Sequence, residues 1–186
     1  EGLRLAVSMS NTIEDFRNFF SSHREKEYFD LKKSIADTLD MSSFFCKDEN
    51  IDIKVEADEE IRLFGYSNEF SQVLLNLINN ARENFKHRDI EENKKFIITL
   101  KKDSNGEIVV DFIDNGGGVD ENIIDRIFEP YFTTKHKSIG TGIGLYMSKQ
   151  IIETQMNGKI EVKNITKVIN DTEYKCAMFT ITFPSV

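Results

Sequence analysis

The chain lacks an excess of basic residues, a cluster of cysteines and any long apolar run. Its 24 Lys and Arg residues are outnumbered by 32 Asp and Glu residues, and the net charge of -8 disfavours nucleic-acid binding. Cys46 and Cys176 stand far apart with no CxxC pattern, so we expect reduced thiols rather than a disulfide or a zinc site. No apolar stretch approaches the roughly 18–20 residues of a membrane span, and no signal-peptide pattern occurs. We therefore expect no membrane contact by this chain and a cytoplasmic location.

The first part of the chain carries an apolar stripe with helical spacing. The residues of this stripe are Leu5, Met9, Ile13, Phe16 and Phe20. Polar residues then interrupt the pattern, so we predict two parts, residues 1–22 and residues 23–186. The stripe needs a partner surface, either the other half of a helical hairpin or the domain that follows. Because residue 1 is Glu rather than Met, we expect the chain to be a piece of a longer protein, with any membrane anchor outside it.

The remaining residues alternate between helical and strand periodicity. Helices are predicted at residues 32–45, 67–86 and 145–156, and Ser67 is placed to cap the longest of them. Strands are predicted at residues 51–56, 61–66, 96–101, 107–113, 158–164 and 174–183. Strands that form hairpins and mix with three helices predict an α/β (α+β) sandwich, in which the helices pack on one face of a mixed β-sheet.

The longest predicted helix carries a row of amides beside its apolar stripe. Asn76, Asn80 and Asn84 recur every four residues, which keeps them on one side of a helix. Asparagine is a mediocre helix former, although a polar helix flank also explains the row. An amide oxygen suits Mg²⁺ that already carries anionic phosphate oxygens. We therefore predict Asn80 as a metal ligand, with Asn76 supporting it or touching phosphate.

A glycine-rich turn follows the strand at residues 107–113. Asp114 stands at the strand end, before Gly116, Gly117 and Gly118, and glycines let a backbone turn sharply close to a ligand. A carboxylate at this place can accept a hydrogen bond from the exocyclic amine of adenine and would reject guanine. The alternative is an ordinary tight turn, which Asp-Asn-Gly forms in many proteins.

The GTGIGL string is predicted to bind phosphate. Its glycines precede a helix, whose first N–H groups lack partners and attract anions. The predicted contacts are Gly140, Thr141, Gly142, Ile143, Gly144 and Leu145. The spacing is neither the GxGxxG of a dinucleotide fold nor the GK[ST] of a P-loop, so both of these folds are disfavoured.

A lid is predicted between these two motifs. Phe128, Tyr131 and Phe132 are read as apolar anchors around a proline, and the polar residues 133–139 as a segment that closes over a triphosphate. Lys135 would face the phosphate charge. A solvated loop with ordinary lysines is the alternative, and it is the better interpretation for Lys137.

In order and form, the four motifs resemble the N, G1, F and G2 boxes of the catalytic ATP-binding domain of two-component sensor histidine kinases. The wider superfamily, with the Bergerat or GHKL fold, also holds Hsp90, MutL and DNA gyrase B. The resemblance covers about residues 28–184, and the conjunction of boxes is specific. It implies a mixed sheet with three main helices on one face and Mg²⁺-ATP bound under a flexible lid.

The resemblance also implies roles for residues and partners. Asn80 would hold the metal and Asp114 the adenine, and the glycines of GTGIGL would bind the phosphates. Residues 1–22 look like the second helix of the dimerisation hairpin, through which the full-length protein would form a homodimer. The phosphoryl group would pass to an aspartate on a response-regulator receiver domain.

The sequence departs from the family pattern in two places. Many members carry a basic residue where this chain has Glu83, so Arg82 or Lys86 is left as an alternative contact to phosphate. The phosphoacceptor motif is also missing, because His23 is followed by Arg24 rather than by an acid. His87 and His136 stand in a helix terminus and in the predicted lid. We expect the acceptor helix upstream of residue 1, so this fragment would carry no catalytic histidine.

One position separates phosphoryl transfer from hydrolysis. Hydrolysing relatives carry a glutamate four residues before the metal-binding asparagine, where this chain has Asn76. An amide cannot take a proton from water as a general base. Our first hypothesis is therefore a protein-histidine kinase. The alternatives are a nucleotide-sensing module without catalysis, a clamp ATPase of the Hsp90 or MutL kind, and a protein-serine kinase of the anti-sigma type.

Overall fold

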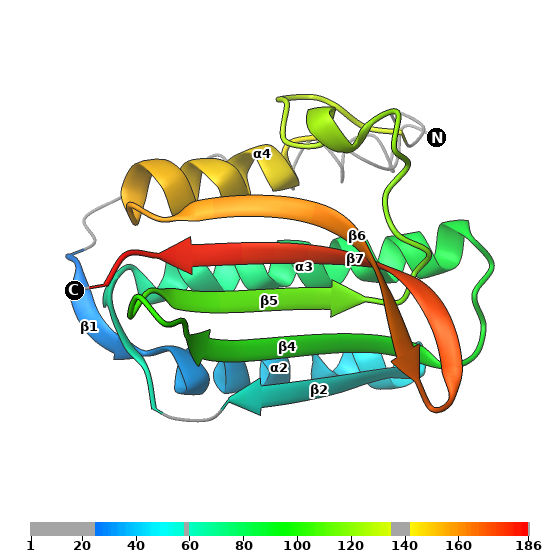
Figure 1. Cartoon of the computed structure of the whole chain (residues 1–186), viewed down its shortest axis with the longest axis horizontal. Helices are drawn as coiled ribbons and strands as arrows, with labels where there is room; N and C mark the ends of the chain where they lie inside the picture. The colour runs from blue at the N-terminus through cyan, green and yellow to red at the C-terminus, as the bar shows by residue number, and fades with distance from the viewer. Residues whose placement is uncertain (1–24, 58–59, 135–141, 186) are drawn as a thin grey trace.

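The computed structural model describes residues 25–57, 60–134 and 142–185, and its centre is a five-stranded mixed sheet (Figure 1). The strands lie in the order β2-β4-β5-β7-β6. Their bounds are β2 Ile51–Ala57, β4 Lys94–Lys102, β5 Ile108–Asp114, β6 Lys159–Ile169 and β7 Thr172–Phe183. β2 and β4 are parallel, and the other neighbours are antiparallel. Strand β1 (Glu27–Asp30) pairs with β3 (Arg62–Gly65) in a separate two-stranded sheet.

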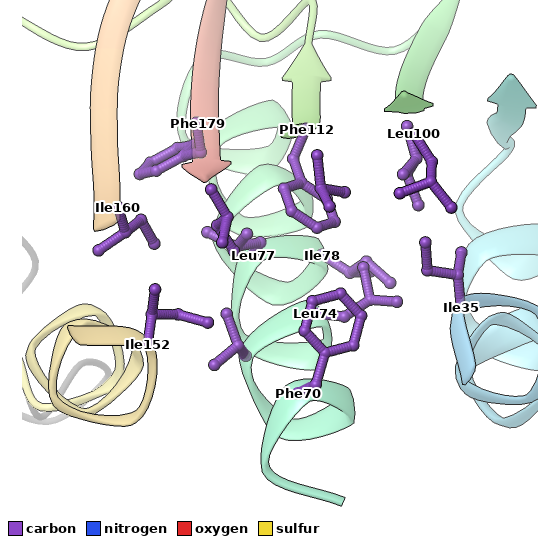
Figure 2. Close-up of a cluster of buried hydrophobic side chains, with 14 of the residues drawn as sticks. Ile35, Phe70, Leu74, Leu77, Ile78, Leu100, Phe112, Ile152, Ile160 and Phe179 are labelled. Atoms are coloured by element: carbon purple, nitrogen blue, oxygen red, sulfur yellow. The ribbon is translucent and has the colours of Figure 1, made fainter. Parts of the chain in front are cut away.

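Three helical segments cover one face of the large sheet (Figures 1 and 2). They are α2 (Leu31–Asp48), α3 (Ser67–His87) and α4 (Gly144–Lys149), which continues without a break into the π-helix η2 (Gln150–Gln155). A short 3₁₀-helix, η1 (Ile124–Arg126), lies between β5 and α4 along the chain. No helix in the described part of the chain is long and apolar enough to cross a membrane.

The core forms where α3 meets the sheet. Figure 2 shows Phe70, Leu74, Leu77 and Ile78 of α3 below the sheet side chains Leu100 of β4, Phe112 of β5, Ile160 of β6 and Phe179 of β7. Residues of α2 and η2 complete the cluster on either side of α3. Each of these α3 side chains is no more than 2% exposed. Full burial of one such side chain stabilises a fold by about 1.5–3 kcal/mol. The apolar stripe of α3 therefore fixes which side of the helix carries the asparagine row.

The predicted sandwich is confirmed, and the differences have local causes. The segment 145–156 is helical as expected, but its second half is a π-helix. The β6–β7 hairpin is longer than predicted. Strand β1 was not predicted because its four residues are too short to show a period. The prediction for Ser67 is wrong: Tyr66 is the N-cap residue, no side chain caps the helix, and Ser67 is already helical. The predicted helix and domain boundary within residues 1–24 lie outside the described residues.

Candidate nucleotide-binding site

The amide row of α3 contacts two other parts of the domain, the start of α4 and the turn after β5. Asn76 Nδ2 donates to the Gly144 carbonyl and to Ser148 Oγ, both at 3.3 Å. Asn84 Nδ2 donates to the Gly116 carbonyl at 3.1 Å. Between them, the partly exposed Asn80 side chain makes no hydrogen bond to any residue that the structure describes. The Asn80 amide oxygen is therefore available to a ligand that lies between the start of α4 and the turn after β5.

Asp114 ends the central strand β5 and is only 5% exposed. Burial raises the pKa of its carboxyl to about 6, and the Gly116 N–H, the Asn84 amide and the Arg88 charge oppose that rise. The Gly116 N–H donates to Asp114 Oδ1 at 2.9 Å. A Cβ on Gly116 would lie 2.7 Å from that oxygen, so the glycine is needed for this contact. The carboxyl is thus held in a fixed orientation at the end of β5.

The turn after Asp114 requires glycine for its backbone as well. Gly117 and Gly118 have φ values of +90° and +76°, which side chains rarely adopt. The Gly117 N–H donates to the Lys175 carbonyl of β7 at 3.0 Å. The predicted sharp turn is therefore present directly after the buried Asp114 carboxyl, and a close approach of its backbone to a ligand stays a prediction.

The start of α4 lies against the segment that precedes it. Gly142 has a φ of +66°, and a Cβ there would lie 2.6 Å from the Tyr131 carbonyl carbon and 2.7 Å from the Phe132 carbonyl oxygen. Ile143 is buried, and Gly144 begins the helix. Gly144 and Leu145 therefore carry N–H groups of the first helical turn, which suit an anion. Lys135, Gly140 and Thr141 lie outside the described residues.

Two of the three predicted aromatic anchors pack as expected. The Phe128 ring meets the Phe179 ring edge to face at 6.3 Å, and Phe132 packs against the core with the Arg126 guanidinium 4.7 Å from its ring centre. The prediction for Tyr131 is wrong, because its side chain is 71% exposed. Its φ of +62° marks a reversal of the chain, which turns both phenylalanines inward and leaves the tyrosine outside.

The basic residues of α3 are held away from the amide row. Arg82 pairs with Glu49 through two nitrogens, and Lys86 Nζ lies 2.7 Å from Glu49 Oε1. The hydrogen bonds from Arg82 lower the pKa of Glu49 to about 2, against the effect of partial burial. The suggestion that Arg82 or Lys86 reaches phosphate is therefore not supported, since both side chains are bound at the end of α2.

Sequence reasoning missed two side chains that hold the glycine turn. Arg88 Nη2 donates to the Gly118 carbonyl at 3.0 Å, and Asn164 forms two hydrogen bonds with the backbone of Val119. Arg88 follows the last helical residue of α3, and Asn164 is 45 residues from Val119. No local spacing could have shown these contacts. Of the three histidines, only His87 is described, and it is exposed at the end of α3.

Residues 65–186 match the family described as histidine kinase-, DNA gyrase B- and HSP90-like ATPases. The chain is 31% identical over 166 residues to the sensor histidine kinase ZraS of Salmonella typhi, an alignment that covers 89% of this chain and 32% of ZraS. The chain spans about a third or less of the length of the curated relatives it matches.

Solved structures share the fold. The nucleotide-free catalytic domain of histidine kinase ThkA superposes with a TM-score of 0.71 at 29% identity, over 87% of this chain and 97% of that domain. ThkA in complex with the response regulator TrrA gives a TM-score of 0.72 at 23% identity, over 97% of this chain and 48% of that one. The chain belongs to the histidine kinase-, DNA gyrase B- and HSP90-like ATPase family, and its described domain is a catalytic ATP-binding domain of the sensor histidine kinase type.

Proposed function

We propose that this chain binds Mg²⁺-ATP and transfers the γ-phosphoryl group to a histidine on a helix outside it. The observation that carries the proposal is the buried Asp114 carboxyl, oriented by the Gly116 N–H at the end of β5. A carboxylate held in this way accepts a hydrogen bond from the amine of adenine and leaves guanine unpaired. Gly118 and Phe128 would border the nucleotide through the turn and through the anchor of the following segment.

The phosphates would lie between α3 and the start of α4. N–H groups from Gly142 to Leu145 would bind them, together with Gly140, Thr141 and Lys135. The unengaged Asn80 amide oxygen fits a magnesium ion, which would neutralise the phosphate charge when bound. Asn76 positions the phosphate site indirectly, since its amide ties α3 to the Gly144 carbonyl and Ser148.

The chemistry of Asn76 favours transfer over hydrolysis. Its Nδ2 group is a donor in both of its hydrogen bonds, and a neutral amide has no lone pair basic enough to activate water. Phosphoryl transfer needs mainly positioning and charge neutralisation, which the rest of this site would supply. The acceptor is then an imidazole nitrogen presented from outside, since it can be neutral and nucleophilic near pH 7.

The wider setting follows from the relatives. The ThkA structure holds a response regulator, and ZraS is named a sensor histidine kinase. We propose a parent protein that dimerises through a hairpin, of which residues 1–22 are one helix, and that passes its phosphoryl group to a receiver domain. The free thiols Cys46 and Cys176 accord with a cytoplasmic setting.

The test uses γ-labelled ATP and the parent protein extended upstream to include its acceptor helix. We expect a label on histidine, which is stable in base and lost in acid, and we expect Asn80→Ala to abolish it. The present chain alone should bind ATP without becoming labelled. If the extended protein binds ATP but never acquires label, the proposed transfer is wrong, and a nucleotide-sensing role replaces it. A steady release of phosphate that Asn76→Ala abolishes would instead indicate an ATPase.

A further inference from the structure

The glycine turn that follows Asp114 is held from two sides by residues distant in sequence. On the α3 side, Asn84 and Arg88 donate to the carbonyls of Gly116 and Gly118. On the other side, Asn164 of β6 contacts Val119, where the turn ends. The backbone that presents the Gly116 N–H to Asp114 is thus fixed at both ends.

Asn164 binds Val119 in the way that a neighbouring strand would. The Val119 N–H donates to Asn164 Oδ1, and Asn164 Nδ2 donates to the Val119 carbonyl, both at 2.7 Å. A side-chain amide carries one acceptor and one donor group with the chemistry of a peptide, which few other side chains combine. Asn164 Nδ2 also lies 2.7 Å from Glu121 Oε1, so the next residues of the loop are held as well.

The contact between Asn164 and the turn is close. A Cβ on Gly118 would lie 2.5 Å from Asn164 Oδ1 and 3.1 Å from Lys175 Cε. The left-handed backbone of Gly118 therefore fits directly against the β6–β7 hairpin. If the Asn164 amide were removed, the bonds to Val119 would be lost. The Gly117 N–H would still donate to the Lys175 carbonyl on the hairpin side, and the Arg88 contact would remain on the other side.

We propose that Asn164 is a positioning residue of the nucleotide site, which fixes the turn so that the Gly116 N–H orients the carboxylate that selects adenine. The inference rests on the proposed ATP binding, and it adds a residue of the far sheet edge to adenine selection. Asn164 would act through the orientation of the Asp114 carboxyl toward adenine, without contacting the nucleotide itself.

The experiment compares Asn164→Ala and Asn164→Asp with the wild-type chain. The aspartate has the same size but cannot donate to the Val119 carbonyl, so it perturbs the site while keeping the packing. The matched control is Thr166→Ala, two residues along β6 with an exposed side chain. Calorimetry gives the affinities for Mg²⁺-ATP and Mg²⁺-GTP, and carboxyl NMR follows the titration of Asp114. Thermal melts verify that each variant is folded.

Both Asn164 variants should bind ATP about tenfold more weakly, because Asn164→Asp loses the two donations from Nδ2 and Asn164→Ala also loses the acceptor for the Val119 N–H. The preference for ATP over GTP should fall, and the pKa of Asp114 should rise as the Gly116 N–H loosens. Thr166→Ala should change none of these. If ATP affinity falls while the ATP:GTP preference and the Asp114 titration stay at wild-type values, or if nothing changes, the positioning role is wrong. A wild-type chain that binds no ATP would instead overturn the proposed function.

Discussion

In its proposed role, Asp114 is buried at the end of the central strand β5 and still serves as an anionic acceptor. Burial raises the pKa of its carboxyl from 3.8 to about 6, so part of the free protein carries a neutral carboxyl in mildly acidic solution. Because the pKa of Asp114 is higher in the folded state than in the unfolded state, the protonated carboxyl stabilises the fold below about pH 4. This stabilisation is lost as the pH rises through about 6. The site therefore holds its key acceptor at some cost to the stability of the free domain.

Nucleotide binding should release a proton from Asp114. An adenine amine donates its hydrogen bond to the ionised carboxyl, which lowers the pKa of Asp114 in the complex. Near pH 6, where the free carboxyl is about half protonated, binding should release about half a proton. Calorimetry of Mg²⁺-ATP binding in buffers of different ionisation heat measures this number, which should fall towards zero above pH 8. Proton uptake, or no exchange at pH 6, would contradict the assigned role.

At the scale of elements, α3 organises the site while its opposite side forms the core. Asn76 ties α3 to α4, and Asn84 ties it to the glycine turn, so α3 sets the separation of the α4 start and the glycine turn. The segment that ends at Phe132 then packs against Gly142 without room for a side chain. The site is thus assembled from close contacts between elements rather than from a single loop.

Gly142→Ala should separate the α4 start from the Tyr131–Phe132 backbone. Because the new Cβ would meet backbone atoms at 2.6 and 2.7 Å in a left-handed conformation, one of the two segments must move. We expect ATP affinity to fall at least about tenfold, with a small change in melting temperature. The control is Met41→Ala. Met41 lies on α2 and is 73% exposed, so its substitution should change neither the ATP affinity nor the melting temperature. Unchanged affinity in the Gly142 variant would show that this contact does not shape the site.

The ion pairs of Glu49 should affect stability and leave nucleotide binding unchanged. Glu49→Gln weakens the bonds to Arg82 and Lys86 that join α2 to α3, which should cost roughly 1–3 kcal/mol at pH 7. Since the folded pKa of Glu49 is lowered to about 2, the stabilisation is present above pH 4.5 and is lost as the pH falls towards 2. Chemical denaturation measures the loss of stability, and calorimetry with ATP measures whether nucleotide binding is unchanged. A large loss of ATP affinity would contradict this prediction and would indicate that Arg82 or Lys86 contacts the phosphates.

The sequence predicted the parts of this fold that are periodic or local. The α3 stripe, the β4–β5 hairpin and the position of Asp114 follow from spacing alone. Tyr131 could not be placed, because its exposure depends on one left-handed residue in an irregular segment. The pairing of Glu49 with Arg82 and of Asn164 with Val119 depends on tertiary structure, which a single sequence does not show.

Over the whole molecule, α3, the turn after β5, the start of α4 and strand β6 are connected by side-chain hydrogen bonds of Asn76, Asn84 and Asn164. The apolar side of α3 packs on the sheet, while its amide side faces the turn after β5 and the start of α4. The family match covers residues 65–186, and the ThkA catalytic domain shares the fold over 87% of the chain. The proposed function depends above all on the selection of adenine by Asp114.

The most direct measurement is a calorimetric titration of the chain with Mg²⁺-ATP and Mg²⁺-GTP, repeated with Asp114→Ala. We predict binding of ATP, little or no binding of GTP, and loss of ATP binding in the variant, while a melting curve shows that the variant is folded. Equal affinity for the two nucleotides, or ATP binding that Asp114→Ala leaves intact, would contradict the account.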